Sequence, residues 1–60
     1  MAAKDKFLKV YVNLPVPERS QVVALIEDEP YSWNAAYLEI SRNTELGQKI
    51  LKKMELLGII

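Results

Sequence analysis

The sequence predicts a small single α+β domain, residues 1–60, with an N-terminal β-hairpin followed by two helices. The hairpin strands are expected at about residues 7–14 and 22–28, and the helices at about residues 33–42 and 44–57. Three observations carry this prediction: apolar residues alternate near the N-terminus, a short apolar run follows two prolines, and a capped amphipathic pattern closes the chain. Residues 1–6 are small and charged, so they are expected to be frayed.

The first strand is predicted from the period-two alternation in "KVYVNLP" and the residues just before it. In an extended chain, apolar side chains would occupy one face and polar or aromatic ones the other. The apolar face holds Leu8, Val10, Val12 and Leu14, and the opposite face holds Lys9, Tyr11 and Asn13. Valine and tyrosine favour a pleated surface, and the prolines that follow would end the ladder.

The second strand is predicted from an apolar run, residues 22–26, with turn residues on both sides. A helix beginning near Pro17 is the alternative, because proline and glutamate suit a first turn. Such a helix would end on Glu27, Asp28 and Glu29, where the helix dipole disfavours anions and no glycine forms a cap. A strand is therefore favoured, and the three acidic residues are expected to form a solvated turn.

Helical spacing predicts the third element. Its apolar face would hold Trp33, Ala36, Tyr37 and Ile40, at positions i, i+3, i+4 and i+7. Ser32 is a good N-cap for this helix, and the two adjacent alanines favour it. A strand is the alternative, because alternation groups Ala36, Leu38 and Ile40 on one face.

The last helix has the clearest pattern. Its apolar stripe consists of Leu46, Ile50, Met54 and Leu57. Thr44 or Asn43 is expected to cap its N-terminus, and Gly58 its C-terminus. Gly47 costs about 1 kcal/mol relative to alanine inside a helix. It is therefore expected to mark the close approach of another backbone.

The residue types exclude most kinds of catalysis. The chain has no cysteine and no histidine, so thiolate nucleophiles, disulfides, the usual general base and the commonest metal ligand are all missing. No enzymatic activity, cofactor or metal is therefore expected. Eight basic and eight acidic residues balance, so the chain lacks the basic excess of a sequence-blind nucleic-acid binder.

Length and hydropathy predict the oligomeric state and the location of the protein. Sixty residues without a disulfide or a metal bury a thin core, so a homodimer or higher homo-oligomer is expected. No apolar run is long enough to span a membrane, and no secretory signal opens the sequence. We therefore expect no membrane contact and a cytoplasmic location.

The stretch "KVYVNLP", followed by helices, resembles the strand of the ribbon-helix-helix DNA-binding family. In that family two strands pair across a dimer, and their outward side chains read the major groove. The resemblance implies a ribbon-helix-helix dimer as an alternative fold, with Lys9, Tyr11 and Asn13 as the readers and "SWNAAY" opening the second helix. A three-stranded meander with one C-terminal helix is the other alternative. All three folds share the first strand and the last helix.

Two functions stay open for a non-catalytic binding protein. The first and preferred one is a small dimeric DNA-binding regulator, antitoxin-like, in which Arg42, Lys49 and Lys53 contact phosphates beside the strand readers. The second is a protein–protein interaction or structural module without nucleic-acid contact. Its interface would draw on the aromatic cluster and the last helix, through Trp33, Tyr37, Ile50, Met54 and Leu57.

Overall fold

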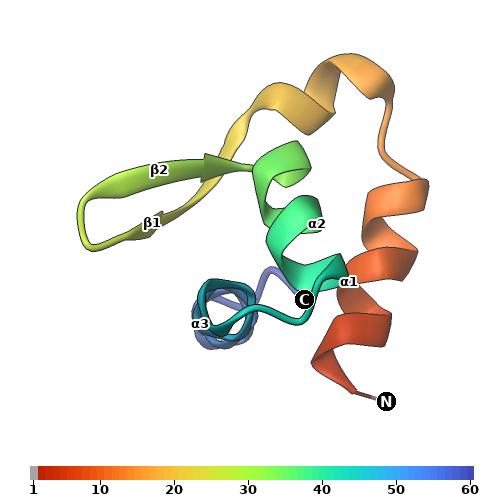
Figure 1. Cartoon of the computed structure of the whole chain (residues 1–60). Coiled ribbons are helices and arrows are strands. Elements are labelled where there is room, and N and C mark those ends of the chain that lie inside the picture. Colours follow the sequence, from red (N-terminus) through yellow and green to blue (C-terminus); the bar gives the residue numbers. More distant parts are fainter. Residues whose placement is uncertain (1) are drawn as a thin grey trace.

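The computed structural model describes residues 2–60 and combines helices with one two-stranded antiparallel sheet (Figure 1). In chain order the elements are α1 (Ala3–Val12), the short 3-10 helix η1 (Val16–Ser20), β1 (Val22–Ile26), β2 (Glu29–Ser32), α2 (Trp33–Ser41) and α3 (Glu45–Leu56). The predicted α+β class is confirmed. Of the residues expected to be frayed, 3–6 belong to α1, and Met1 lies outside the described residues.

The prediction of a strand at residues 7–14 is wrong, because most of this stretch is the helix α1. It carries a helical period as well as an alternating one: Ala3, Phe7 and Tyr11 recur at i, i+4 and i+8 and pack into the core. Phe7 is fully buried, and its ring stacks on Trp33 with 5.6 Å between the centroids. This contact between distant parts of the chain favours the helix. The ribbon-helix-helix and meander alternatives need the missing strand, so neither matches the observed elements.

The strand predicted at residues 22–28 is confirmed over Val22–Ile26 as β1, but residues 27–28 are not part of it, and its partner is β2 and not residues 7–14. Ile26 pairs with Glu29, so a two-residue turn of Glu27 and Asp28 joins the strands. Both turn residues have positive φ, 52° and 68°, as a type I′ turn requires. Glu27 and Asp28 thus form the predicted turn, in a conformation that asparagine and glycine adopt more readily, whereas Glu29, also expected in the turn, begins β2.

Replacing this turn by asparagine and glycine, Glu27→Asn with Asp28→Gly, is expected to raise the free energy of unfolding by about 1 kcal/mol. Glycine adopts positive φ freely, whereas for other residues this conformation is energetically unfavourable. The exposed ion pair between Glu27 and Lys49, 3.7 Å apart, is lost but contributes little. Urea unfolding measures the change. The control, Glu27→Ala with Asp28→Ala, removes the same charges at positive φ, so equal stability of the two variants would contradict the explanation.

Both predicted C-terminal helices are confirmed, each end within one residue of its expected position. Ser32 caps α2, because its Oγ accepts a hydrogen bond from the Ala35 N–H at 3.1 Å. Thr44 caps α3 in the same way and accepts from the Gly47 N–H at 3.0 Å. These short-range caps explain why the helix starts were predictable from the local sequence.

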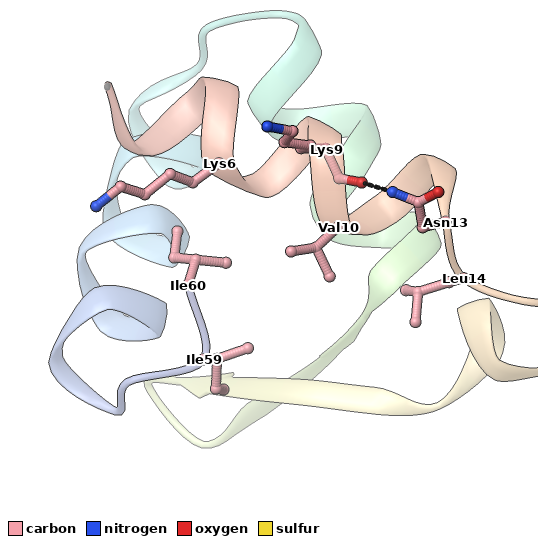
Figure 2. Close-up of a pocket in the computed structure, with 7 residues that line it drawn as sticks. All are labelled: Lys6, Lys9, Val10, Asn13, Leu14, Ile59 and Ile60. Carbon is pink, nitrogen blue, oxygen red and sulfur yellow. Dashed lines mark hydrogen bonds between the residues drawn. The ribbon is translucent and has the colours of Figure 1, made fainter.

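The residues after α3 fold back onto its last turn. Gly58 has a φ of 74°, and its N–H donates to the Glu55 carbonyl at 3.1 Å. The Ile59 N–H donates to the Met54 carbonyl at 2.9 Å, which completes a Schellman motif. The predicted glycine cap is thereby confirmed, and it directs residues 59–60 toward α1 (Figure 2).

The core draws on all three α-helices and on β1. Its buried members are Phe7, Ala24, Ala36, Ile40, Ile50, Leu51 and Met54. Gly47 confirms the predicted close approach of two backbones, since a Cβ there would lie 2.5 Å from the Glu39 carbonyl oxygen of α2. The accessible surface is 4042 Å², and a folded monomer of this mass typically exposes about 4,000 Å². The single chain is therefore about as compact as a typical folded monomer of its mass.

Candidate interaction surface

The three residues predicted to read DNA lie on or just after α1 and do not form one row. The Tyr11 ring stacks on Tyr37 with 4.5 Å between centroids, and its hydroxyl donates to Asn34 Oδ1 at 2.7 Å. Asn13 Nδ2 donates to the Lys9 carbonyl at 2.8 Å, at the end of α1 (Figure 2). The Tyr11 and Asn13 side chains are thus engaged within the chain, while the Lys9 side chain extends outward.

Tyr11→Thr is expected to lower the free energy of unfolding by about 2–3 kcal/mol, because it removes ring contacts and a cation–π contact. The Tyr11 ring stacks on Phe7 and Tyr37, and the Arg19 guanidinium carbon lies 4.5 Å from its centroid. Thermal unfolding followed by circular dichroism measures the loss. Tyr11→Phe keeps the ring and should cost about 1 kcal/mol for the lost hydrogen bond. If Tyr11→Thr is no worse than Lys9→Ala, the ring does not stabilise the fold.

The basic residues predicted to contact phosphates lie at separate places. Arg42 follows α2 in the turn before α3, whereas Lys49 and Lys53 belong to α3. Lys49 Nζ lies 3.7 Å from Glu27 Oε1 of the hairpin turn. Lys53 lines a hollow beside β1. Lys49 is therefore paired with the acidic turn, while Lys53 borders an apolar surface.

The residues predicted to form a protein interface differ in their exposure. Ile50 and Met54 are fully buried within the single chain. Trp33 and Tyr37 are partly buried and pack against the core. Leu57 is 58% exposed, so of the five it is the one most open to a partner.

An open groove separates α1 from the C-terminal residues (Figure 2). Its aliphatic side chains come from Val10 and Leu14 on one side and from Ile59 and Ile60 on the other. Its polar lining consists of Lys6, Lys9 and Asn13. In Figure 2, Val10, Leu14 and Ile59 point into the groove, and the ammonium groups of the two lysines point away from it. The groove is thus apolar inside and basic along its α1 edge.

A second hollow lies between β1 and the end of α3. It is lined by Val22, Val23, Ala24, Leu25, Lys53 and Leu57. Val22 is 60% exposed, and Leu25 is 58% exposed. Leu57 lines this hollow and Ile59 lines the groove, so one short segment contributes to both. We call Val10, Leu14, Val22, Leu25, Leu57, Ile59 and Ile60 together the apolar surface.

Only Leu57 of the apolar surface was predicted from the sequence as an interface residue. A signal is present for Val22, Leu25, Ile59 and Ile60, but not for Val10 and Leu14. The run "VVALI" holds more aliphatic residues than one covered face of a strand requires, and "LLGII" continues apolar beyond the end of the last helix. Neither pattern tells which of its side chains stay exposed, since that depends on how the hairpin and the C-terminal segment pack.

The charged side chains beside the apolar surface are of one sign. Lys6 and Lys9 line the groove and Lys53 lines the hollow, whereas no carboxylate side chain lines either. Within residues 2–60 the one ion pair joins Lys49 to Glu27. None of the three lysines at the apolar surface therefore has a carboxylate partner in the described part of the chain.

Carboxylates instead gather around Tyr31, near the hairpin turn. The Tyr31 hydroxyl donates to Glu29 Oε2 at 3.1 Å. The pKa of Tyr31 is raised above its ordinary value of 10.0, first by desolvation, then by this hydrogen bond and by the negative charges of Glu29, Glu39 and Glu27. The neutral sequence thus folds into a protein with an acidic region at the turn and a basic edge at the apolar surface.

No group of three or more acidic side chains within residues 2–60 could hold a metal ion. None of the described helices has both the length and the apolar character needed to cross a membrane. Comparison with known proteins found no matching family model, no matching curated protein and no matching solved structure. Function must therefore be inferred from the surface of this chain, where aliphatic side chains and unpaired lysines lie together.

Proposed function

We propose that this protein is a small non-catalytic binding module that recognises a partner protein through the apolar surface. The observation that carries the proposal is the exposure of neighbouring aliphatic side chains: Val22, Leu25 and Leu57 line one hollow and are each more than half exposed. Burying such side chains contributes roughly 25 cal/mol per Å² of apolar area removed from water. Contiguous apolar patches on folded domains generally mark sites of contact.

Binding rather than catalysis is favoured by the side chains that the surface offers. Its lining consists of aliphatic residues, three lysines and one asparagine. It contains no carboxylate side chain, and the whole chain has no histidine or cysteine, so the usual general bases and nucleophiles are missing. Aliphatic groups contribute affinity without proton transfer, as a recognition surface requires.

A DNA-binding regulator, antitoxin-like, is the second candidate. Lys6, Lys9 and Lys53 have no carboxylate partner within residues 2–60, so they are available to phosphates. This candidate ranks second because Tyr11 and Asn13 make hydrogen bonds within the chain, and because the groove and the hollow are lined mainly by aliphatic side chains. Binding of a labelled random-sequence duplex that weakens steeply with rising salt would favour it.

The experiment compares two double variants with the parent protein. The surface variant is Val22→Ser with Leu25→Ser, and the control is Val12→Ser with Leu38→Ser. The control side chains are 65% and 50% exposed and line neither hollow. Proteins that co-purify with the parent are identified, and the complex is reconstituted from purified components. The surface variant is expected to bind at least about tenfold more weakly, because two apolar anchors are lost.

The control variant is expected to bind the reconstituted partner as the parent does. Equal losses in both variants, or no loss in either, would contradict the proposal. Circular dichroism of both variants shows whether each one is folded before its affinity is compared.

The expected homo-oligomer stays a prediction, and sedimentation equilibrium at micromolar concentrations tests it. A mass of 6.9 kDa at every concentration would contradict self-association. If the parent self-associates and the surface variant does not, the protein that the apolar surface recognises is a second copy of this chain. If both self-associate equally, the oligomer uses another face.

A further inference from the structure

We propose that the groove between α1 and residues 59–60 binds an amphipathic helix of a partner protein, with carboxylates flanking its apolar stripe. This inference deepens the proposed function and rests on it. Two features of the groove carry it. Its walls are aliphatic and offer no row of free backbone amides to an incoming strand, and the lysines along one edge have no carboxylate side chain as partner within residues 2–60.

The walls of the groove favour a helix over an extended strand. The side formed by α1 has its backbone amides engaged in helical hydrogen bonds. On the opposite side, the Ile59 N–H donates to the Met54 carbonyl at 2.9 Å. The groove therefore offers an incoming strand no row of free amides with which to pair. A helix has already satisfied its own backbone, and it can bind through side chains alone.

The apolar contacts available to that helix are Val10 and Leu14 on one side and Ile59 on the other. Figure 2 shows these three side chains pointing into the groove. An amphipathic helix presents apolar residues at i, i+3, i+4 and i+7, which form one stripe suited to such a groove. The occupant therefore needs an aliphatic stripe, which a nucleic-acid backbone does not have.

The positive charge along the groove favours acidic residues beside the apolar stripe of the bound helix. Lys6 and Lys9 line the groove, no carboxylate side chain does, and within residues 2–60 neither lysine makes an ion pair. Because both ammonium groups point away from the inside of the groove, they would pair with glutamate or aspartate on the flanks of the occupant and speed the encounter. A second copy docked symmetrically would bring the same lysines together, because a two-fold contact uses one patch twice. The charges therefore favour a different, acidic partner.

The test uses two labelled synthetic helical peptides with one leucine stripe in common. Glutamates flank the stripe in the first peptide, and lysines replace them in the second. Fluorescence anisotropy with the intact protein at low salt measures both affinities. The glutamate peptide is expected to bind about tenfold more tightly, since its carboxylates pair with Lys6 and Lys9, whereas the ammonium groups of the other peptide are repelled. The ratio should fall as salt rises, because exposed charges are screened.

Two charge-reversal variants locate the effect. Lys6→Glu with Lys9→Glu is expected to reverse the preference between the peptides. The control, Arg42→Glu with Lys52→Glu, changes the net charge equally at residues that do not line the groove, and it should keep the preference. Val10→Ser with Ile59→Ser should weaken the binding of both peptides. Circular dichroism confirms that each variant is folded.

Three results would overturn the inference. The first is equal binding of both peptides, and the second is an equal shift in the groove and control variants. The third is binding to phosphatidylserine vesicles, lost in the groove variant, with no binding of the glutamate peptide, because the occupant would then be an anionic lipid surface. One combination of results separates this inference from the proposed function. If Val22→Ser with Leu25→Ser abolishes a reconstituted complex while the peptides do not bind, the proposed binding module is supported and only the amphipathic helix as the occupant of the groove is wrong.

Discussion

Met54→Asp is expected to unfold the protein, with a loss in free energy of unfolding of at least about 4 kcal/mol. Met54 is fully buried in α3, within the cluster that also contains Phe7, Ile40 and Ile50. A carboxylate there would lose its hydration without gaining a partner, because the cluster contains no polar side chain. A domain of this size has about 5 kcal/mol of stability to lose. Circular dichroism and thermal unfolding measure the change.

Two controls separate burial of the charge from other effects of the substitution. Met54→Leu keeps the volume and should cost less than about 1.5 kcal/mol. Leu56→Asp places the same carboxylate two residues further along α3 at a position that is 76% exposed. It should cost about 0.5–1 kcal/mol, because a negative charge is unfavourable near the C-terminus of a helix. If Met54→Asp melts like Leu56→Asp, this side of α3 does not face the core.

Gly47→Ala is expected to lower the free energy of unfolding by about 2 kcal/mol, although alanine is the better helix former. An added Cβ would lie 2.5 Å from the Glu39 carbonyl oxygen, 2.7 Å from its carbonyl carbon and 2.9 Å from the Ile40 nitrogen. All three are backbone atoms of α2 and cannot rotate away. The two helices must therefore separate, which disturbs the buried Ile40 side chain.

The sign of the Gly47→Ala effect makes this prediction sharp. Helix propensity by itself would stabilise the protein by about 1 kcal/mol. If urea unfolding shows that Gly47→Ala raises the free energy of unfolding, α2 and α3 do not approach so closely. Gly58→Ala is the control for backbone conformation, because a Cβ there meets nothing within 4 Å and only the φ of 74° is unfavourable. It should cost about 1 kcal/mol.

Local sequence was sufficient to predict the C-terminal half of the fold. Ser32 and Thr44 each cap a helix by accepting a hydrogen bond from an amide three residues ahead. Gly58 ends α3 through contacts within one turn. Glu27 and Asp28 also lie in a turn as expected, although the role of this turn in joining β1 to β2 was not predicted. Such features depend on neighbours a few residues away, so the sequence of those neighbours predicts them.

The candidate site was much less predictable than the helices. Lys9, Lys53 and Leu57 were singled out and do border or line the apolar surface. Tyr11 and Met54 were also singled out, but one is engaged in a stack and the other is fully buried. Patterns of residue type identify side chains that are able to bind. Which of them remain open is decided when the elements pack.

The sequence by itself determined the α+β class, the two capped helices, the strand β1 and the absence of histidine and cysteine chemistry. Only the tertiary structure decided the state of residues 7–14, where alternation and a helical period coexist. The helix forms there because Phe7 and Tyr11, one turn apart, then stack on Trp33 and Tyr37 of α2. In a strand, Phe7 and Tyr11 would instead lie about 13 Å apart along the extended chain. The energy that distinguishes the two states comes from contacts more than twenty residues away, which no local pattern contains.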